Sequence, residues 1–139
     1  MLCYLRRMIN IHEFRLGNFL LHKEAGRIRM KPCAFQHFEL MARGEIKDLF
    51  PVVLKAELLE QCGFVENKDY PLLPAAREFV LVLPVSGSQK SEIRAYIKNN
   101  QECFGRAMLN GLPASNNFHQ LHQLQNLYHA LTGADLVVK

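Results

Sequence analysis

Three of the six histidines lie near the carboxyl end of the chain, at a spacing that suits one side of a helix. His119, His122 and His129, with Asn126, form a stripe when each residue advances by about 100°. Neutral imidazoles one turn apart can share a metal ion, but His129 is about 10 Å beyond His122 at ~1.5 Å per residue, and the helix offers no carboxylate. We therefore expect no metal site and interpret the stripe as a solvated or partner-binding face.

A second group of charged residues alternates with apolar ones. Arg27, Arg29 and Lys31 flank Ile28 and Met30, so on a strand the three cations project from one face. Such a basic face is solvated and could follow the phosphates of a nucleic acid. A charged edge that prevents strand-to-strand aggregation is the alternative, and we favour it because no aromatic residue for base stacking interleaves with these cations.

Residue patterns typical of catalysis are absent from the sequence. It contains no His-Glu-x-x-His, Gly-x-Ser-x-Gly, P-loop or dinucleotide-binding glycine pattern. Cys33 and His37 could form a thiol–imidazole pair, but on a strand four residues span about 13 Å at ~3.3 Å per residue. We expect no catalytic residues and no cofactor.

The amino-terminal half is predicted to contain strands and one short helix. The first strand covers residues 9–21, with an interruption near Gly17, and a turn at 24–26 joins it to the basic strand in a hairpin. A third strand is expected over residues 34–41. A short helix follows over 55–61, where Gly63 provides the stop.

The carboxyl-terminal half is predicted to form an antiparallel meander followed by the clearest helix of the chain. Strands are expected over 78–85, 92–98 and 103–109, with Glu92, Arg94 and Tyr96 facing solvent on the second strand. The helix should cover Asn117 to Thr132, and a short strand could end the chain. The apolar face of that helix consists of Leu121, Leu124, Leu127, Tyr128 and Leu131.

Composition and length predict one small domain. The chain has 139 residues, of which 49% are hydrophobic and 22% charged, typical of a globular α+β protein. We expect a flexible lead over residues 1–8 and a single domain over 9–139, with an antiparallel sheet that is open or barrel-like. Four dispersed cysteines indicate buried thiols in the cytoplasm, and no apolar run suits a membrane.

The final helix resembles a known group of sequences. His122-Gln-Leu-Gln-Asn-Leu-Tyr128, with Ala130-Leu-Thr-Gly133, is similar to the carboxyl-terminal signature of uncharacterised proteins common in Bacteroidetes genomes and their phages. Phe14-Arg-Leu-Gly-Asn18 and Cys62-Gly-Phe64 resemble further segments of that family. Leu54-Lys55-Ala56 departs from it, because the family usually has a Ser or Thr cap and acids there. The resemblance implies a shared fold and cellular setting but no activity.

The sequence therefore predicts a non-catalytic interaction or accessory module of bacterial or prophage origin. Its expected partner-binding residues are His119, His122, Asn126 and His129. The alternative is a nucleic-acid-binding protein of low sequence specificity that uses Arg27, Arg29 and Lys31. A small enzyme assembled from residues distant in the sequence is a third hypothesis.

Overall fold

The computed structural model describes residues 9–69, 73, 75–84, 90–99 and 102–139. The expected lead over residues 1–8 lies outside this part of the chain. The α+β class is confirmed: the described residues form three α-helices and two antiparallel sheets, neither of which closes into a barrel. None of these helices is long and apolar enough to cross a membrane.

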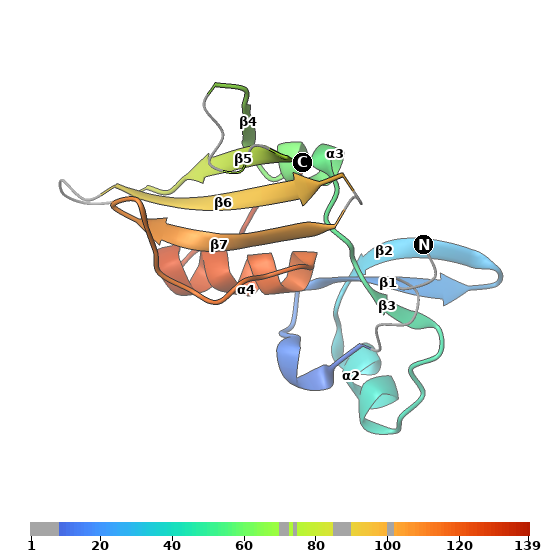
Figure 1. Ribbon diagram of the computed structural model, residues 1–139. Coiled ribbons are helices and arrows are strands. Elements are labelled where there is room, and N and C mark those ends of the chain that lie inside the picture. The colour runs from blue at the N-terminus through green and yellow to red at the C-terminus, as the bar shows by residue number, and fades with distance from the viewer. Residues whose placement is uncertain (1–8, 70–72, 74, 85–89, 100–101) are drawn as a thin grey trace. The chain divides into compact units, whose positions relative to one another are not determined.

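The chain divides into two compact units (Figure 1). Unit 1 comprises the chain up to Val53 together with Gln120–Asn126, and unit 2 comprises Leu54–His119 together with Leu127–Lys139. Each unit thus combines two separate stretches of sequence. That residues 9–139 form a single domain stays a prediction.

Unit 1 is built on a three-stranded sheet of order β2-β1-β3. Its elements are η1 (Ile11–Glu13), β1 (Phe19–Glu24), β2 (Arg27–Pro32), α2 (Phe35–Ala42) and β3 (Leu49–Pro51). The core of the unit consists of Ile9, Phe14, Leu20, Cys33, Met41 and Leu49. The expected first strand over 9–21 is therefore wrong in extent, because a 3-10 turn comes first and β1 starts only at Phe19.

The predicted hairpin is confirmed. β1 pairs with β2 in antiparallel register from Phe19 opposite Pro32 to Glu24 opposite Arg27. The two residues of the turn have positive φ, 50° at Ala25 and 77° at Gly26, as tight turns with the twist of a hairpin require.

The predicted third strand over 34–41 is wrong, since these residues form helix α2 instead. His37 and Met41, one turn apart, are the buried residues of this helix, so the burial pattern has a helical period. Ala34 offers no capping side chain, but the Nδ1 atom of His37 accepts a hydrogen bond from the Ala34 N–H at 2.9 Å. A histidine thus completes the start of a helix that lacks a Ser, Asp or Asn cap.

Unit 2 is built on a five-stranded sheet of order β4-β5-β6-β7-β8. Its elements are α3 (Ala56–Gln61), β4 (Val65–Asn67), β5 (Ala76–Val82), β6 (Ser91–Lys98), β7 (Cys103–Leu109) and β8 (Leu112–Pro113). The predicted short helix and the strands predicted over 92–98 and 103–109 are confirmed. The strand predicted over 78–85 is confirmed only up to Val82, where β5 ends, and residue 85 lies outside the described residues. In Figure 1 the second half of α4 (Leu121–Thr132) runs along the β6–β7 part of this sheet.

Helix α4 starts four residues later than predicted. Phe118 and Gln120 form antiparallel bridges with Gly105 and Val53, so their backbone is extended. Gln123 then receives a hydrogen bond on Oε1 from the Gln120 N–H at 3.1 Å, which satisfies one of the free donors at the helix start.

The apolar face of α4 is confirmed at Leu121 and Leu124, both with 0% exposure, but Leu131 is 47% exposed. The expected final strand is absent from the described residues after Thr132. Leu136 is buried there without a strand, and the Lys139 N–H donates to the Gln61 carbonyl at 3.0 Å.

Candidate functional site

The histidine stripe is not a solvent-facing surface along its whole length. His122 is only 1% exposed, so the expectation that this imidazole faces solvent is wrong. His119 lies before α4, is exposed, and places Nδ1 at 3.3 Å from the Cys103 carbonyl oxygen. His129 is half-buried.

His122 packs inside unit 1 against the segment that precedes β1. Its ring stacks on Phe14, with 4.0 Å between the ring centroids and 17° between the planes. Its Nε2 atom lies 3.6 Å from a carboxylate oxygen of Glu13. Burial lowers the pKa of His122, while the Glu13 carboxylate partly opposes this shift. A neutral imidazole at pH 7 follows.

Asn126 and Gln125 also use their polar groups within unit 1. The Asn126 Nδ2 group donates to the Glu13 carbonyl at 2.7 Å, and its Oδ1 accepts from Arg15 Nε at 2.6 Å. Gln125 Oε1 accepts from the Phe19 N–H at 2.9 Å. These bonds fasten η1 and the start of β1 to the first turns of α4. Partner binding by the stripe stays a prediction, with His119 its most exposed member.

The predicted basic residues lie together on β2. Arg27 and Arg29 are exposed, whereas Lys31 is half-buried and pairs with Glu24. The hydrogen bond and charge of Lys31 lower the pKa of the Glu24 carboxyl. Within the described part of the chain, neither arginine forms an ion pair, so both guanidinium groups are available to a ligand.

The opposite face of the hairpin is apolar and exposed. Ile28 is 53% and Met30 42% exposed, and the register places half-buried Leu21 and Phe50 on the same face as Met30. The hairpin therefore presents cations on one face and uncovered apolar side chains on the other. Sequence alternation could indicate the two faces but not that both are accessible.

The basic face is hollowed near the turn. A depression of about 310 Å³ is lined by His22, Glu24, Ala25, Arg27, Arg29 and Lys31. His22 Nδ1 lies 3.0 Å from a Glu24 carboxylate oxygen, and its ring meets His37 edge-on, with 5.4 Å between centroids. Burial is the main cause that lowers the pKa of His37, and electrostatic interactions with His22 and Lys31 lower it further.

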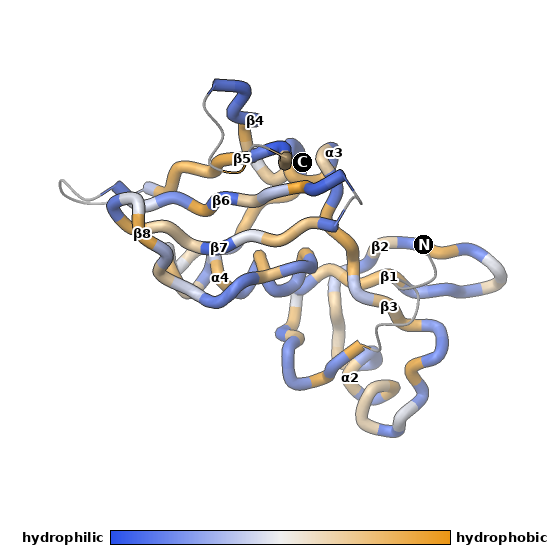
Figure 2. Tube along the Cα trace, viewed as in Figure 1, coloured by the Kyte–Doolittle hydropathy of each residue, from blue (hydrophilic) through white to orange (hydrophobic). Residues whose placement is uncertain are grey.

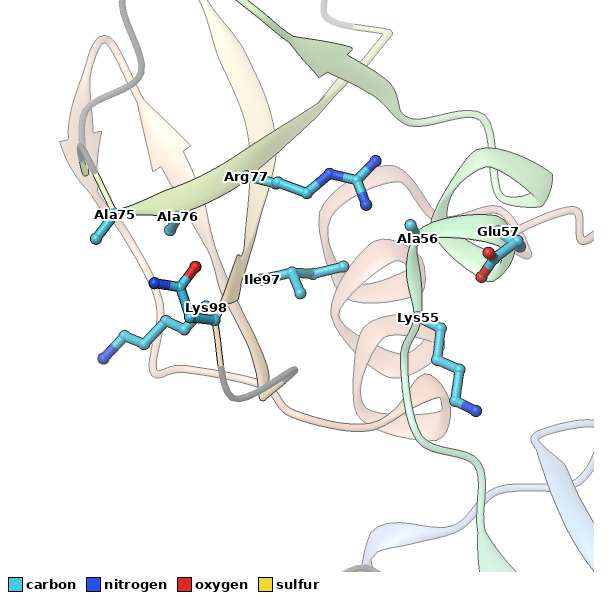
Figure 3. A pocket seen from close by; sticks show the side chains of 9 residues that line it. Lys55, Ala56, Glu57, Ala75, Ala76, Arg77, Ile97 and Lys98 are labelled. Atoms are coloured by element: carbon cyan, nitrogen blue, oxygen red, sulfur yellow. The ribbon is translucent and has the colours of Figure 1, made fainter. Parts of the chain in front are cut away.

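A larger hollow lies in unit 2, between α3 and the ends of β5 and β6. Its volume is about 810 Å³, and its lining includes Lys55, Arg77, Ile97 and Lys98. Figure 3 shows that the Lys55 and Lys98 side chains extend away from each other. Arg77 is held by Glu66 through contacts of 2.8 and 3.0 Å. These cations do not converge, so the hollow lacks the geometry of an anion site.

A buried polar network crosses the five-stranded sheet of unit 2. Arg94 bonds Glu92 through Nε at 2.6 Å and Glu78 through Nη1 at 3.2 Å, and Asn67 donates to Glu78 at 2.7 Å. Glu78, Tyr96 and Glu92 are 0%, 1% and 3% exposed. The expectation that Glu92 and Tyr96 face solvent is therefore wrong. Each carboxylate has a cationic partner, which suits a structural role.

The described cysteines are buried thiols, as expected: Cys33, Cys62 and Cys103 form no disulfide. Burial raises the pKa of Cys33 to about 11, so this thiol is protonated at neutral pH. The separation of about 13 Å expected between Cys33 and His37 assumed a strand of ~3.3 Å per residue, which helix α2 replaces. Cys3 lies outside the described residues.

The described residues contain no group of three or more His, Cys, Asp and Glu side chains that could hold a metal ion.

Comparison of the chain with models of protein families, with curated proteins and with solved structures found no match. The resemblance to Bacteroidetes and phage proteins therefore stays a prediction. On the β1–β2 hairpin, exposed arginines and exposed apolar side chains lie on one strand.

Proposed function

We propose that the chain is a non-catalytic interaction module that binds an acidic partner through the β1–β2 hairpin. The observation that supports this is that β2 has two arginines, Arg27 and Arg29, without an ion pair among the described residues, next to the exposed apolar residues Ile28 and Met30. Exposed apolar groups beside polar or charged residues, arginine in particular, are typical of binding surfaces.

The distribution of charge supports the same proposal. The whole chain has a net charge of +4, of which Arg6 and Arg7 provide two. The hairpin has four cations, Lys23 included, and the single carboxylate of Glu24, a net charge of +3. Without the hairpin and without Arg6 and Arg7, the net charge of the remaining chain is −1. Figure 2 shows hydrophilic residues around the hairpin turn.

The test is a charge reversal on the hairpin. Arg27→Glu combined with Arg29→Glu should leave the thermal midpoint nearly unchanged, because exposed charges contribute little to stability. It should abolish recovery of proteins that co-purify with the full-length chain from its host. Lys47→Glu with Lys68→Glu is the matched control and should retain them. Equal recovery by both double variants would contradict the proposal.

Nucleic-acid binding by Arg27, Arg29 and Lys31 is the second candidate. The three cations repeat along β2 at twice the strand rise of about 3.3 Å per residue, which suits successive phosphates of an extended strand. Affinity for a fluorescent oligonucleotide should then fall steeply with salt, with a logarithmic slope of about 0.7 to 0.9 per phosphate contact. Absence of binding at low ionic strength would exclude this candidate.

The bacterial or prophage setting belongs to the same proposal. It is supported by the resemblance of His122–Tyr128 and Ala130–Gly133 to the Bacteroidetes signature. Identification of the neighbouring genes would test it: an unrelated genomic setting would contradict it.

A further inference from the structure

We propose that the outer edge of β2 binds an extended segment of a partner protein, in which acidic and apolar residues alternate. This inference rests on the proposed function, since it specifies the partner for the same hairpin. The mode is strand addition, in which main-chain hydrogen bonds provide affinity and alternate side chains provide specificity.

Strand β2 lies at an edge of the three-stranded sheet. In the order β2-β1-β3, the outer side of β2 has no neighbouring strand among the described residues. β3 pairs only with Leu20 to His22 of β1, so the end of the hairpin extends past it (Figure 1). An edge of this kind presents unpaired N–H and C=O groups.

The register identifies which backbone groups are free. The Cys33 N–H donates to the Asn18 carbonyl at 2.7 Å, and antiparallel hydrogen bonds recur at every second residue. Lys31, Arg29 and Arg27 therefore direct their backbone groups toward β1. Ile28 and Met30 direct theirs outward. Pro32 follows them and has no N–H, which limits the edge to a short segment.

The side chains specify the chemistry of the added strand. Its residues on one face would lie beside exposed Arg27 and Arg29, where carboxylates form favourable cross-strand pairs. Its residues on the other face would lie beside Ile28 and Met30, which are 53% and 42% exposed. Alternating acidic and apolar residues fit both faces together.

A second copy of this chain does not fit the edge. Antiparallel pairing of β2 with itself about Arg29 would place Arg29 opposite Arg29 and Arg27 opposite Lys31. Like charges directly opposite each other destabilise a sheet. The cations of β2 therefore favour a partner strand with acidic residues over a second copy of this chain. Protection against aggregation accounts for the arginines but not for two apolar residues left uncovered.

A labelled, capped peptide of alternating glutamate and valine provides the probe, with the full-length protein titrated by fluorescence anisotropy. The control peptide has the same composition in two blocks, all glutamates before all valines. We expect the alternating peptide to bind at least about tenfold more tightly, since only it matches the period of a strand. Equal affinity of the two peptides would overturn the inference.

Two substitutions at Met30 distinguish what its backbone N–H and what its side chain contribute to peptide affinity. Met30→Pro removes the outward N–H, and Met30→Ala keeps it while removing most of the apolar surface. The proline variant should lose about tenfold more affinity than the alanine variant. Because proline can disturb β2, amide exchange in the unaltered protein is measured as well. Peptide should slow exchange at Ile28 and Met30, and unchanged exchange there would overturn the inference.

The failure of this inference is distinguishable from failure of the proposed function. If Arg27→Glu with Arg29→Glu abolishes partner recovery but the alternating peptide does not bind, strand addition is overturned and the hairpin remains the interaction surface. Binding of an oligonucleotide without binding of the peptide would overturn strand addition in favour of nucleic acid. If the protein forms a dimer and Met30→Pro abolishes it, the acidic partner strand is overturned in favour of a second copy of this chain.

Discussion

At the scale of single residues, burial decides what an ion pair contributes. Arg94 and Arg77 lie on neighbouring strands of one sheet, and each pairs with glutamate. The Arg94 side chain is 17% exposed and its partners Glu78 and Glu92 are 0% and 4%, whereas Arg77 is 53% exposed. Loss of Arg94 leaves the carboxylates of Glu78 and Glu92 buried without compensation, whereas loss of Arg77 leaves the carboxylate of Glu66 hydrated.

Arg94→Met should therefore destabilise the protein strongly. It leaves the Glu78 and Glu92 carboxylates buried without their cation, at a cost of about 3 kcal/mol or more in the free energy of unfolding. Arg77→Met is the matched control and should cost about 1 kcal/mol at most, since its pair with Glu66 is solvated. Urea unfolding of both variants measures the difference. Similar losses would show that the network is not effectively buried.

A second residue-scale effect concerns pH. Burial lowers the pKa of both His122 and His37 in the folded protein, whereas an unfolded histidine has a pKa of about 6.5. Below pH 6.5 the unfolded chain therefore binds protons that the folded protein does not. The free energy of unfolding should fall as pH decreases from about 6.5, until the pH reaches the lowered pKa values.

Replacement of His122 should reduce this acid sensitivity. In His122→Gln the fall in unfolding free energy between pH 7 and pH 5 should be smaller than in the unaltered protein, because one proton-linked group is gone. It should not vanish, since His37 still contributes. His37→Gln should also reduce the fall, and the double variant should show the smallest fall. Chemical unfolding at the two pH values tests this, and an unchanged slope in His122→Gln would contradict it.

At the scale of elements, two hairpin turns show how the same backbone is made from different residues. Ala25-Gly26 has φ values of 50° and 77°, and Asn110-Gly111 has 51° and 81°. Both first positions are left-handed, a conformation that costs alanine more free energy than asparagine. The turn of the proposed binding hairpin is therefore the more strained of the two.

Ala25→Asn should stabilise the protein by about 1 kcal/mol, because asparagine removes part of the cost of a left-handed alanine. Asn110→Ala should have the opposite effect, and a larger one, since Asn110 also accepts a hydrogen bond from the Lys90 N–H at 2.9 Å. Urea midpoints report both changes. Ala114→Asn, at an exposed position without positive φ, controls for asparagine itself and should be neutral. A neutral Ala25→Asn would contradict the strain.

At the scale of the whole molecule, both units contain cysteines, and each of the described cysteines is buried. Burial raises the pKa of Cys33 and Cys62 to about 11 and that of Cys103 to about 12. The thiolate is the reactive form of cysteine. The native protein should therefore be resistant to thiol reagents at all three positions.

Alkylation measures this resistance. In a Cys3→Ser variant, iodoacetamide at pH 8 should modify Cys33, Cys62 and Cys103 at least about a hundredfold more slowly in the native protein than in urea, because the thiolate is scarce and access requires opening. Mass spectrometry of digests reports each site. Rapid native modification at one cysteine would show that its surroundings open readily.

The sequence alone predicted correctly those elements that depend on signals between neighbouring residues. The Ala25-Gly26 turn, the strands β5 to β7 and the short helix α3 follow from alternation, turn residues and a glycine stop, all of which act between neighbours in the sequence. The α+β class follows from the same signals. These predictions required no knowledge of what each element packs against.

Only the tertiary structure determined which polar residues are buried. His122 is buried because Phe14 and Glu13, more than a hundred residues away in the sequence, cover it. Glu92 is buried beside Arg94, which also bonds Glu78 on the neighbouring strand. Residues 35–42 became a helix through burial of His37 and Met41. The residues that cover His122 and the second partner of Arg94 lie on other elements of the fold, so spacing along the sequence does not identify them.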